Sequence, residues 1–300
     1  MNISFQRIFT IIKLTLREAV RRRLIYFLLL SGVLFIAAGT GCVSACQNLQ
    51  SNAISMTQDD AGNTPAIDTR QSEQNGGEIV INSILSAFLF SMIAICLYAT
   101  SALFTPFLAM NDFQTGNHIT LLSRPLRRSE YLTGKFTAII ALLLMALSIL
   151  LLSSFGAIYL FRGSTDWNLL RGVPALFSGI LTFTAMLFFL SLFLDRILAP
   201  VFSILILSLS AIPGISLISG KEDAITDLGS QIAFYSMAYG LPGYALNFFY
   251  ALDIVLKNSP IHVIKVGVNS GLYATFVNLV WFLVFYSLSL LIFQKKKLNA

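Results

Sequence analysis

Charged side chains are scarce in this sequence. Asp, Glu, Lys and Arg together make up 11% of its 300 residues, whereas 56% of the residues are hydrophobic. A soluble domain usually carries about 25% charged residues, which cover the surface that faces water. A water-soluble fold is therefore excluded, and the long apolar runs of the chain indicate a membrane protein.

Histidine and cysteine are also rare, which limits the chemistry that the chain can perform. The two histidines, His118 and His262, are predicted to lie on opposite sides of the membrane, and no HExxH, CxxC or GxSxG motif occurs. Cys42 and Cys46 would share one helix face, an arrangement that does not suit a disulfide. We therefore predict no catalytic residue, no metal site and no cofactor-binding residue. The small residues before Cys42 also fit a lipoprotein signal, so modification of that cysteine stays open.

Six apolar segments are long enough to cross a membrane, which takes roughly 20 consecutive apolar residues. Each is expected to be an α-helix, because a segment in lipid must satisfy its own backbone hydrogen bonds. The predicted fold class is an all-α polytopic membrane protein with one transmembrane domain over residues 24–300. Its predicted spans are about 24–45, 81–110, 136–161, 173–194, 197–218 and 271–293.

The basic residues predict the orientation of these spans. Of the 20 Lys and Arg residues, 14 fall in the N-terminus, the second and fourth connections and the C-terminal tail, and 6 fall in the other connections. The positive-inside rule assigns the richer group to the cytoplasm. We therefore expect both termini in the cytoplasm. The net charge of +6 reflects this sidedness, and no nucleic-acid partner is needed to explain it.

Residues 1–23 predict an amphipathic helix that lies in the membrane interface. A large apolar sector opposite a cationic face is typical of such helices. The alternative is a basic run that only orients the first span. The predicted apolar sector consists of Phe5, Ile8, Phe9, Ile12, Leu16, Ala19 and Val20.

Two of the outer connections differ in character. Residues 46–80 are polar and almost free of aromatic residues, so we expect a flexible loop. Residues 219–270 are aromatic and apolar but are interrupted by Gly and Pro. We predict short outer-leaflet or re-entrant helices there, between spans five and six, with two further full spans as the alternative.

The segment between the second and third predicted spans is the largest cytoplasmic loop. Its Gly134-Lys135 pair suggests a phosphate-binding loop, but GxxxxGK[ST] requires Gly at 129 and Ser or Thr at 136, where this chain has Ser129 and Phe136. We therefore expect no ATP site. Residues 111–125 are expected to form a short helix on the membrane surface, and Ser129 is expected to cap the third span.

Ionisable residues are essentially missing from the predicted spans. Ion-coupled carriers generally place such residues inside the membrane, where they hold the coupling ion. An ion-coupled secondary carrier is therefore the weaker alternative function. A membrane scaffold that recruits cytoplasmic partners without transport is a second alternative.

Two segments of the sequence resemble one known family. TGNHITLLSRPLRRSEYLTGKF (residues 115–136) resembles the cytoplasmic loop of permease subunits of type-2 ABC exporters, which commonly show Gly, LLS, Pro, Arg, an aromatic residue and GK there. KLTLREAVRRRLIYFLLL (residues 13–30) resembles that family's amphipathic helix and first span. The basic tail after Phe293 agrees with the family as well.

The resemblance implies a function and a set of partners. In that family a coupling helix in this loop docks on a separate ATPase subunit, and two permeases and two ATPases form the transporter. This chain would then be the permease of an exporter in the bacterial cytoplasmic membrane, without enzymatic activity or a bound cofactor, while its partner subunit uses ATP. Its other partners would be a second copy or a related permease and membrane lipids.

The resemblance also implies which residues dock on the ATPase, within the loop 111–135. The transported substrate is not predicted, because the spans are expected to offer only apolar side chains. The implied docking residues are Asn111, Asp112, Phe113, Gly116, Ile119, Leu122, Arg124, Arg127 and Arg128.

Overall fold

The computed structural model describes residues 5–21, 69–114, 128–162, 167–195, 197–218, 244–256 and 268–295, together with the single residues 30, 32, 34, 37, 41 and 242. Every regular element in these ranges is an α-helix. The elements are α1 (Phe5–Arg21), α3 (Thr69–Gln114), α5 (Arg128–Arg162), α6 (Asn168–Leu190), α7 (Leu198–Ile218), α9 (Tyr244–Leu256) and α10 (Val268–Lys295).

Four of these helices are long and apolar enough to cross a membrane. They contain the segments Leu85–Ala109, Ser129–Leu160, Asn168–Leu190 and Gly271–Lys295, which correspond to the second, third, fourth and sixth predicted spans. The all-helical prediction holds for the described residues, whereas the count of six spans is not confirmed.

The two other predicted spans are only partly described. The first, 24–45, lies outside the described residues except for five isolated helical positions. The fifth, 197–218, corresponds to α7, an apolar helix of 21 residues over Leu198–Ile218 that is not among the four candidate spans. In the 219–270 region, α9 is one short helix of 13 residues.

Several predicted boundaries were wrong. The flexible loop predicted over 46–80 ends earlier, because α3 already begins at Thr69 and continues as one helix of 46 residues. Once an apolar segment has nucleated a helix, each further residue adds a backbone hydrogen bond at little cost, which explains the extension. At 1.5 Å per residue α3 is about 69 Å long, more than twice the hydrocarbon thickness of a bilayer.

The helices α5 and α6 also differ from the predicted spans. The helix α5 begins at Arg128, so Ser129 lies inside the helix and is not its cap. The helix α6 covers Asn168–Leu190, and residues 191–194 continue as hydrogen-bonded turns where the predicted span ran to 194.

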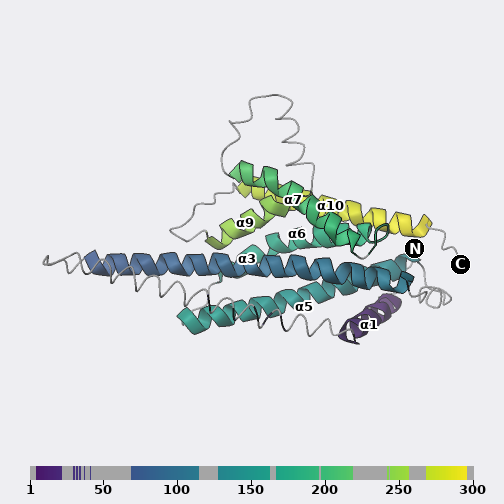
Figure 1. Ribbon diagram of the computed structural model, residues 1–300, viewed down its shortest axis with the longest axis horizontal. Coiled ribbons are helices and arrows are strands. Elements are labelled where there is room, and N and C mark those ends of the chain that lie inside the picture. The colour runs from purple at the N-terminus through teal and green to yellow at the C-terminus, as the bar shows by residue number, and fades with distance from the viewer. Residues whose placement is uncertain are drawn as a thin grey trace, which may run out of the picture.

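The helix α6 lies at the centre of the bundle. It packs against α3, α7, α9 and α10, and 67% of its span residues are buried, compared with 17% for α10. In Figure 1, α3 and α5 lie side by side on one face, with α1 next to the beginning of α5, and α7, α9 and α10 lie on the opposite face. The helices α3, α6 and α10 run in one direction and α5 runs in the other.

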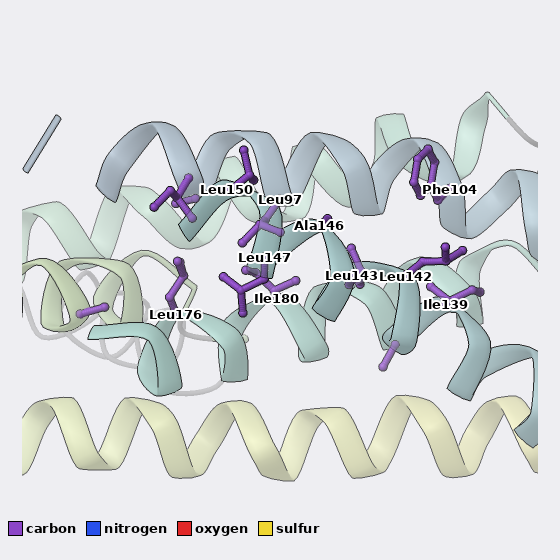
Figure 2. Packing of buried hydrophobic residues seen from close by; sticks show 14 of the residues in the cluster. Leu97, Phe104, Ile139, Leu142, Leu143, Ala146, Leu147, Leu150, Leu176 and Ile180 are labelled. Atoms are coloured by element: carbon purple, nitrogen blue, oxygen red, sulfur yellow. The ribbon is translucent and has the colours of Figure 1, made fainter. Parts of the chain in front are cut away.

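The apolar core fills the space between α3, α5 and α6. Figure 2 shows its labelled side chains between these helices, and on α5 they recur at spacings of three and four residues, which places them on one face. Because lipid tails are as apolar as leucine, van der Waals packing stabilises such a core more than the hydrophobic effect does. The labelled residues are Leu97, Phe104, Ile139, Leu142, Leu143, Ala146, Leu147, Leu150, Leu176 and Ile180.

The helix α1 covers most of the predicted N-terminal helix, but its packed face differs from the predicted apolar sector. Ile11, Thr15 and Ala19 are buried, whereas Phe9 and Val20 remain exposed. The prediction missed Ile11 and Thr15, because they lie at the edge of the apolar sector that faces α5. The exposed edge with Phe9 and Val20 has no described neighbour that buries it.

Glycine permits the close contact between α6 and α9. A Cβ atom at Gly172 would lie 2.8 Å from the Ala251 carbonyl oxygen and 2.9 Å from Cγ2 of Val255, whereas a Cβ atom at Gly156 would meet no atom of the described residues within 4 Å. The same substitution is therefore expected to have opposite effects at the two sites.

We predict that Gly172→Ala lowers and Gly156→Ala raises the stability of the protein. Ala at position 156 removes the intrinsic helix penalty of glycine, about 0.5–1 kcal/mol. At position 172 the clash with a backbone carbonyl should outweigh that gain and cost about 1–3 kcal/mol. The midpoint of thermal unfolding in detergent measures both changes. Equal shifts for the two variants would contradict the close contact of α6 and α9.

Candidate functional site

The first two turns of α5 lie where three other helices converge. We call this region the α5 junction and define it as residues 130–136 of α5 together with Ile11 of α1, Leu108 of α3, and Tyr286 and Phe293 of α10. Glu130 and Lys135 retain only 3% and 2% exposure, although both are ionisable. Buried ionisable residues in a membrane protein mark a candidate functional site, because burial is costly unless partners compensate it.

Gly134 sets the distance between α1 and α5. A Cβ atom at this position would lie 2.8 Å from Cγ2 and 2.9 Å from Cβ of Ile11, closer than real Cβ contacts. The Ile11 side chain therefore occupies the space that any other residue would need. Small residues allow membrane helices to approach in this way.

Lys135 links α5 to α3. Its Nζ donates a hydrogen bond of 2.7 Å to the backbone carbonyl of Leu108, and it lies 5.3 Å from the centroid of the Tyr131 ring. A carbonyl oxygen and the negative face of an aromatic ring both stabilise an ammonium group that has lost its hydration. The lysine of the Gly-Lys pair therefore contacts protein groups within the bundle.

The helix α10 closes the junction from the opposite side. The Tyr286 hydroxyl donates a hydrogen bond of 2.9 Å to Oγ1 of Thr133, and the Tyr131 and Phe293 rings stack with centroids 6.3 Å apart. The Phe136 ring lies 5.0 Å from that of Tyr286, centroid to centroid. Every residue of α5 from Tyr131 to Phe136 except Leu132 thus has an identified contact with α1, α3, α10 or a neighbouring ring.

A second polar region lies at mid-length in the bundle. Asn247 of α9 donates from Nδ2 to the Ala175 carbonyl and to Oγ of Ser178, both at 2.7 Å, and its Oδ1 accepts from Thr275 at 3.0 Å. We call these contacts and the neighbouring Thr182 the polar seam. The prediction that the spans offer only apolar side chains was wrong here. A few serine, threonine and asparagine residues lower the mean hydropathy of a long apolar segment only slightly, so the segment still reads as apolar.

The polar seam continues towards α3. The hydroxyl groups of Ser101 and Thr184 lie 2.8 Å apart, and a Cβ atom at Gly179 would lie 2.9 Å from the Tyr98 hydroxyl. These polar groups therefore connect α3, α6, α9 and α10 inside the apolar bundle. Within the described residues, no three His, Cys, Asp or Glu side chains gather in a way that suits a metal ion.

The predicted docking residues lie next to the α5 junction in the chain, but few of them are described. Asn111, Asp112 and Phe113 belong to the last turn of α3, which ends at Gln114 and not at 110, and Arg128 is the first residue of α5. The remaining docking residues and most of the predicted surface helix lie outside the described residues. The predicted docking residues that the structure does not describe are Gly116, Ile119, Leu122, Arg124 and Arg127.

Sequence reasoning missed the residues that form the α5 junction. It tested the Gly-Lys pair only as a nucleotide loop, whereas Gly134 and Lys135 are packing and hydrogen-bonding residues. The alternation of small, aromatic and basic residues in YLTGKF was the available signal. Such a pattern at the start of an apolar helix is compatible with close helix contacts.

A family model described as ABC-2 family transporter protein matches residues 9–298 of the chain. Searches of curated proteins and of solved structures found no match. The matched range begins in α1 and extends beyond α10, so it includes both the α5 junction and the polar seam.

We predict that Gly134→Leu separates α1 from α5. A cysteine placed at Thr15, a buried position of α1, should be protected from a water-soluble maleimide in the parent protein. It should react at least about tenfold faster in the Gly134→Leu variant, which corresponds to a loss of about 1.4 kcal/mol of packing. The native cysteines are replaced beforehand. A cysteine at Thr10, which is exposed, serves as the control and should react equally in both proteins. Continued protection at position 15 would contradict the described contact.

Proposed function

The chain belongs to the ABC-2 family of transporter proteins, and we propose that it is the membrane-spanning permease subunit of an ATP-driven exporter. The match over residues 9–298 is the observation that carries this proposal. The chain is a multi-pass membrane protein, and proteins of this family normally work with an ABC ATPase. We propose the bacterial cytoplasmic membrane as its location, with both termini in the cytoplasm.

The loop between α3 and α5 is the proposed docking element for the ATPase. It leaves the last turn of α3 at Gln114 and returns at Arg128, only two residues before the α5 junction begins. A segment that is anchored closely at both ends can transmit a push or a pull to the helices that hold it. We infer that Ile119 and Leu122 are the apolar anchors and that Arg124, Arg127 and Arg128 position the loop.

Lys135 links the two helices that flank this loop inside the bundle. Its hydrogen bond to Leu108 joins the two helices that flank the loop, and Pro106 lies two residues before that contact. Proline has no backbone N–H and weakens the helix around it. The last turns of α3 are therefore expected to move with α5 when the ATPase moves the loop.

From the α5 junction the displacement would reach two further helices. Ile11 packs on Gly134, so α1 is expected to follow α5, and the Tyr286–Thr133 hydrogen bond extends the link to α10. A second copy of the chain or a related permease would complete the translocation path. In this proposal ATP is used by the partner subunit, and this chain has no enzymatic activity of its own.

The described spans contain little that could hold a coupling ion. Leu85–Ala109 has no charged residue, and in Ser129–Leu160 both charged residues, Glu130 and Lys135, lie at the α5 junction. The other two spans each contain one, the exposed residues Arg171 and Lys295 near their ends. This distribution favours a transporter that is driven by a separate ATPase over an ion-coupled carrier.

We predict that Asp at Ile119 or Leu122 abolishes recruitment of the ATPase. Buried apolar anchors carry most of the energy of an interface, and a carboxylate there would be desolvated without a partner. Co-purification of the two subunits from membranes measures recruitment, with the abundance of the variant permease as reference. Arg124→Glu should weaken recruitment less, and mainly at low salt, because rim charges are screened.

Asn117→Asp is the matched control for these substitutions. It adds the same charge to the same loop without removing an apolar side chain, so recruitment should persist. If Asp at both apolar positions leaves co-purification intact, this loop is not the docking element. An effect as large for Asn117→Asp would mean that charge alone disturbs the loop.

A further inference from the structure

Asn278 of α10 differs from every other buried amide of the described bundle. Its side chain is fully buried, at 0% exposure, yet neither Nδ2 nor Oδ1 has a hydrogen-bond partner in the part of the chain that the structure describes. Asn247, one helix away, is just as buried and uses both ends of its amide in bonds to α6 and α10. Buried polar groups in native proteins are almost always paired, so the Asn278 amide requires an explanation.

The surroundings of Asn278 are polar on the side that faces α6. Oγ1 of Thr182 donates a hydrogen bond of 2.7 Å to the backbone carbonyl of Asn278, so the hydroxyl group lies next to the residue that carries the orphan amide. Thr182 itself is fully buried, and no described residue donates a hydrogen bond to its oxygen. Among the described residues, an unpaired amide and a hydroxyl oxygen that accepts no bond thus belong to two residues that are in contact through the Asn278 carbonyl.

These groups lie within the length of the bundle helices. Thr182 is 14 residues from the start of α6 and 8 residues from its end, which is about 21 Å and about 12 Å along the helix. Both side chains are fully buried, and an unpaired amide is more costly in a membrane bundle than near a surface. An apolar residue of similar size would avoid this cost, so the amide is expected to bind something.

We propose that Asn278 and Thr182 form a binding site for an internal water molecule between α6 and α10. Water matches the chemistry of the site, because it accepts a hydrogen bond from Nδ2 and donates to Oδ1 or to the hydroxyl oxygen of Thr182. A buried water typically makes two to four such bonds, and the two residues supply that number. A cation is less suitable, because the amide N–H and the Thr182 oxygen do not provide a set of several oxygen ligands.

The water would extend the polar seam and add a second bridge between α6 and α10, beside the direct bond from Thr182 to the Asn278 carbonyl. A water-mediated contact tolerates small shifts of one helix against the other better than a direct bond does, since the water can reorient. This inference concerns one chain and does not depend on the docking of an ATPase.

A density map of the full chain in lipid nanodiscs, at a resolution that shows ordered water, tests the proposal directly. We expect a peak of the size of one water molecule within about 3 Å of the Asn278 amide. A map that shows other buried waters but none here would overturn the proposal. A partner from the protein, or density larger than water, would overturn it as well.

A pair of variants provides an independent measurement. Asn247→Ala and Asn278→Ala remove the same side-chain group from two buried positions, so both leave a cavity of similar size. The difference between their thermal unfolding midpoints therefore reports the hydrogen bonds that each amide makes. We expect Asn278→Ala to lower the midpoint by about 2–4 °C, as for one lost net hydrogen bond in a chain of this size, and Asn247→Ala to lower it by more. A rise for Asn278→Ala would mean a dry, unpaired amide, and a fall equal to that of Asn247→Ala would mean a protein partner. Either result contradicts the water site.

Discussion

The close approach of α1 to α5 at Gly134 is the contact on which the arrangement of the α5 junction depends. The Ile11 side chain fills the space next to this glycine, and the following residue, Lys135, can then be buried with its ammonium group on the Leu108 carbonyl. The ring contacts of Tyr131 and Phe136 with α10 fix the opposite side of the same two helical turns.

Direct contacts through small or polar residues also organise the middle of the bundle. In α6, Gly172 and Gly179 allow neighbouring groups to approach closely, while Ser178, Thr182 and Thr184 bond across to three other helices. Lipid supplies no hydrophobic force between helices, so such contacts decide which helices pair. The α5 junction and the polar seam therefore connect through α6, whose Phe188 ring meets that of Phe136.

Hydropathy predicted the helical class and the approximate location of four spans, because an uninterrupted apolar run has few alternatives in a membrane. It failed at helix ends, where propagation extends α3 back to Thr69 through polar residues that have no apolar signature. The α5 junction was missed for a different reason. The roles of Gly134 and Lys135 depend on Ile11 and Leu108, and the local composition around the Gly-Lys pair does not identify these distant partners.

We propose that the first turns of α5 transmit movement of the docking loop to the helices around them. The test uses spin labels at two exposed positions, Arg17 of α1 and Leu205 of α7, in the complex with the ATPase. The measured quantity is the change in the distance between the two labels when a non-hydrolysable ATP analogue is added. We expect a shift in the parent protein and a much smaller one in Lys135→Met, although that variant still retains the ATPase. An equal shift in both proteins, or none in the parent, would contradict it.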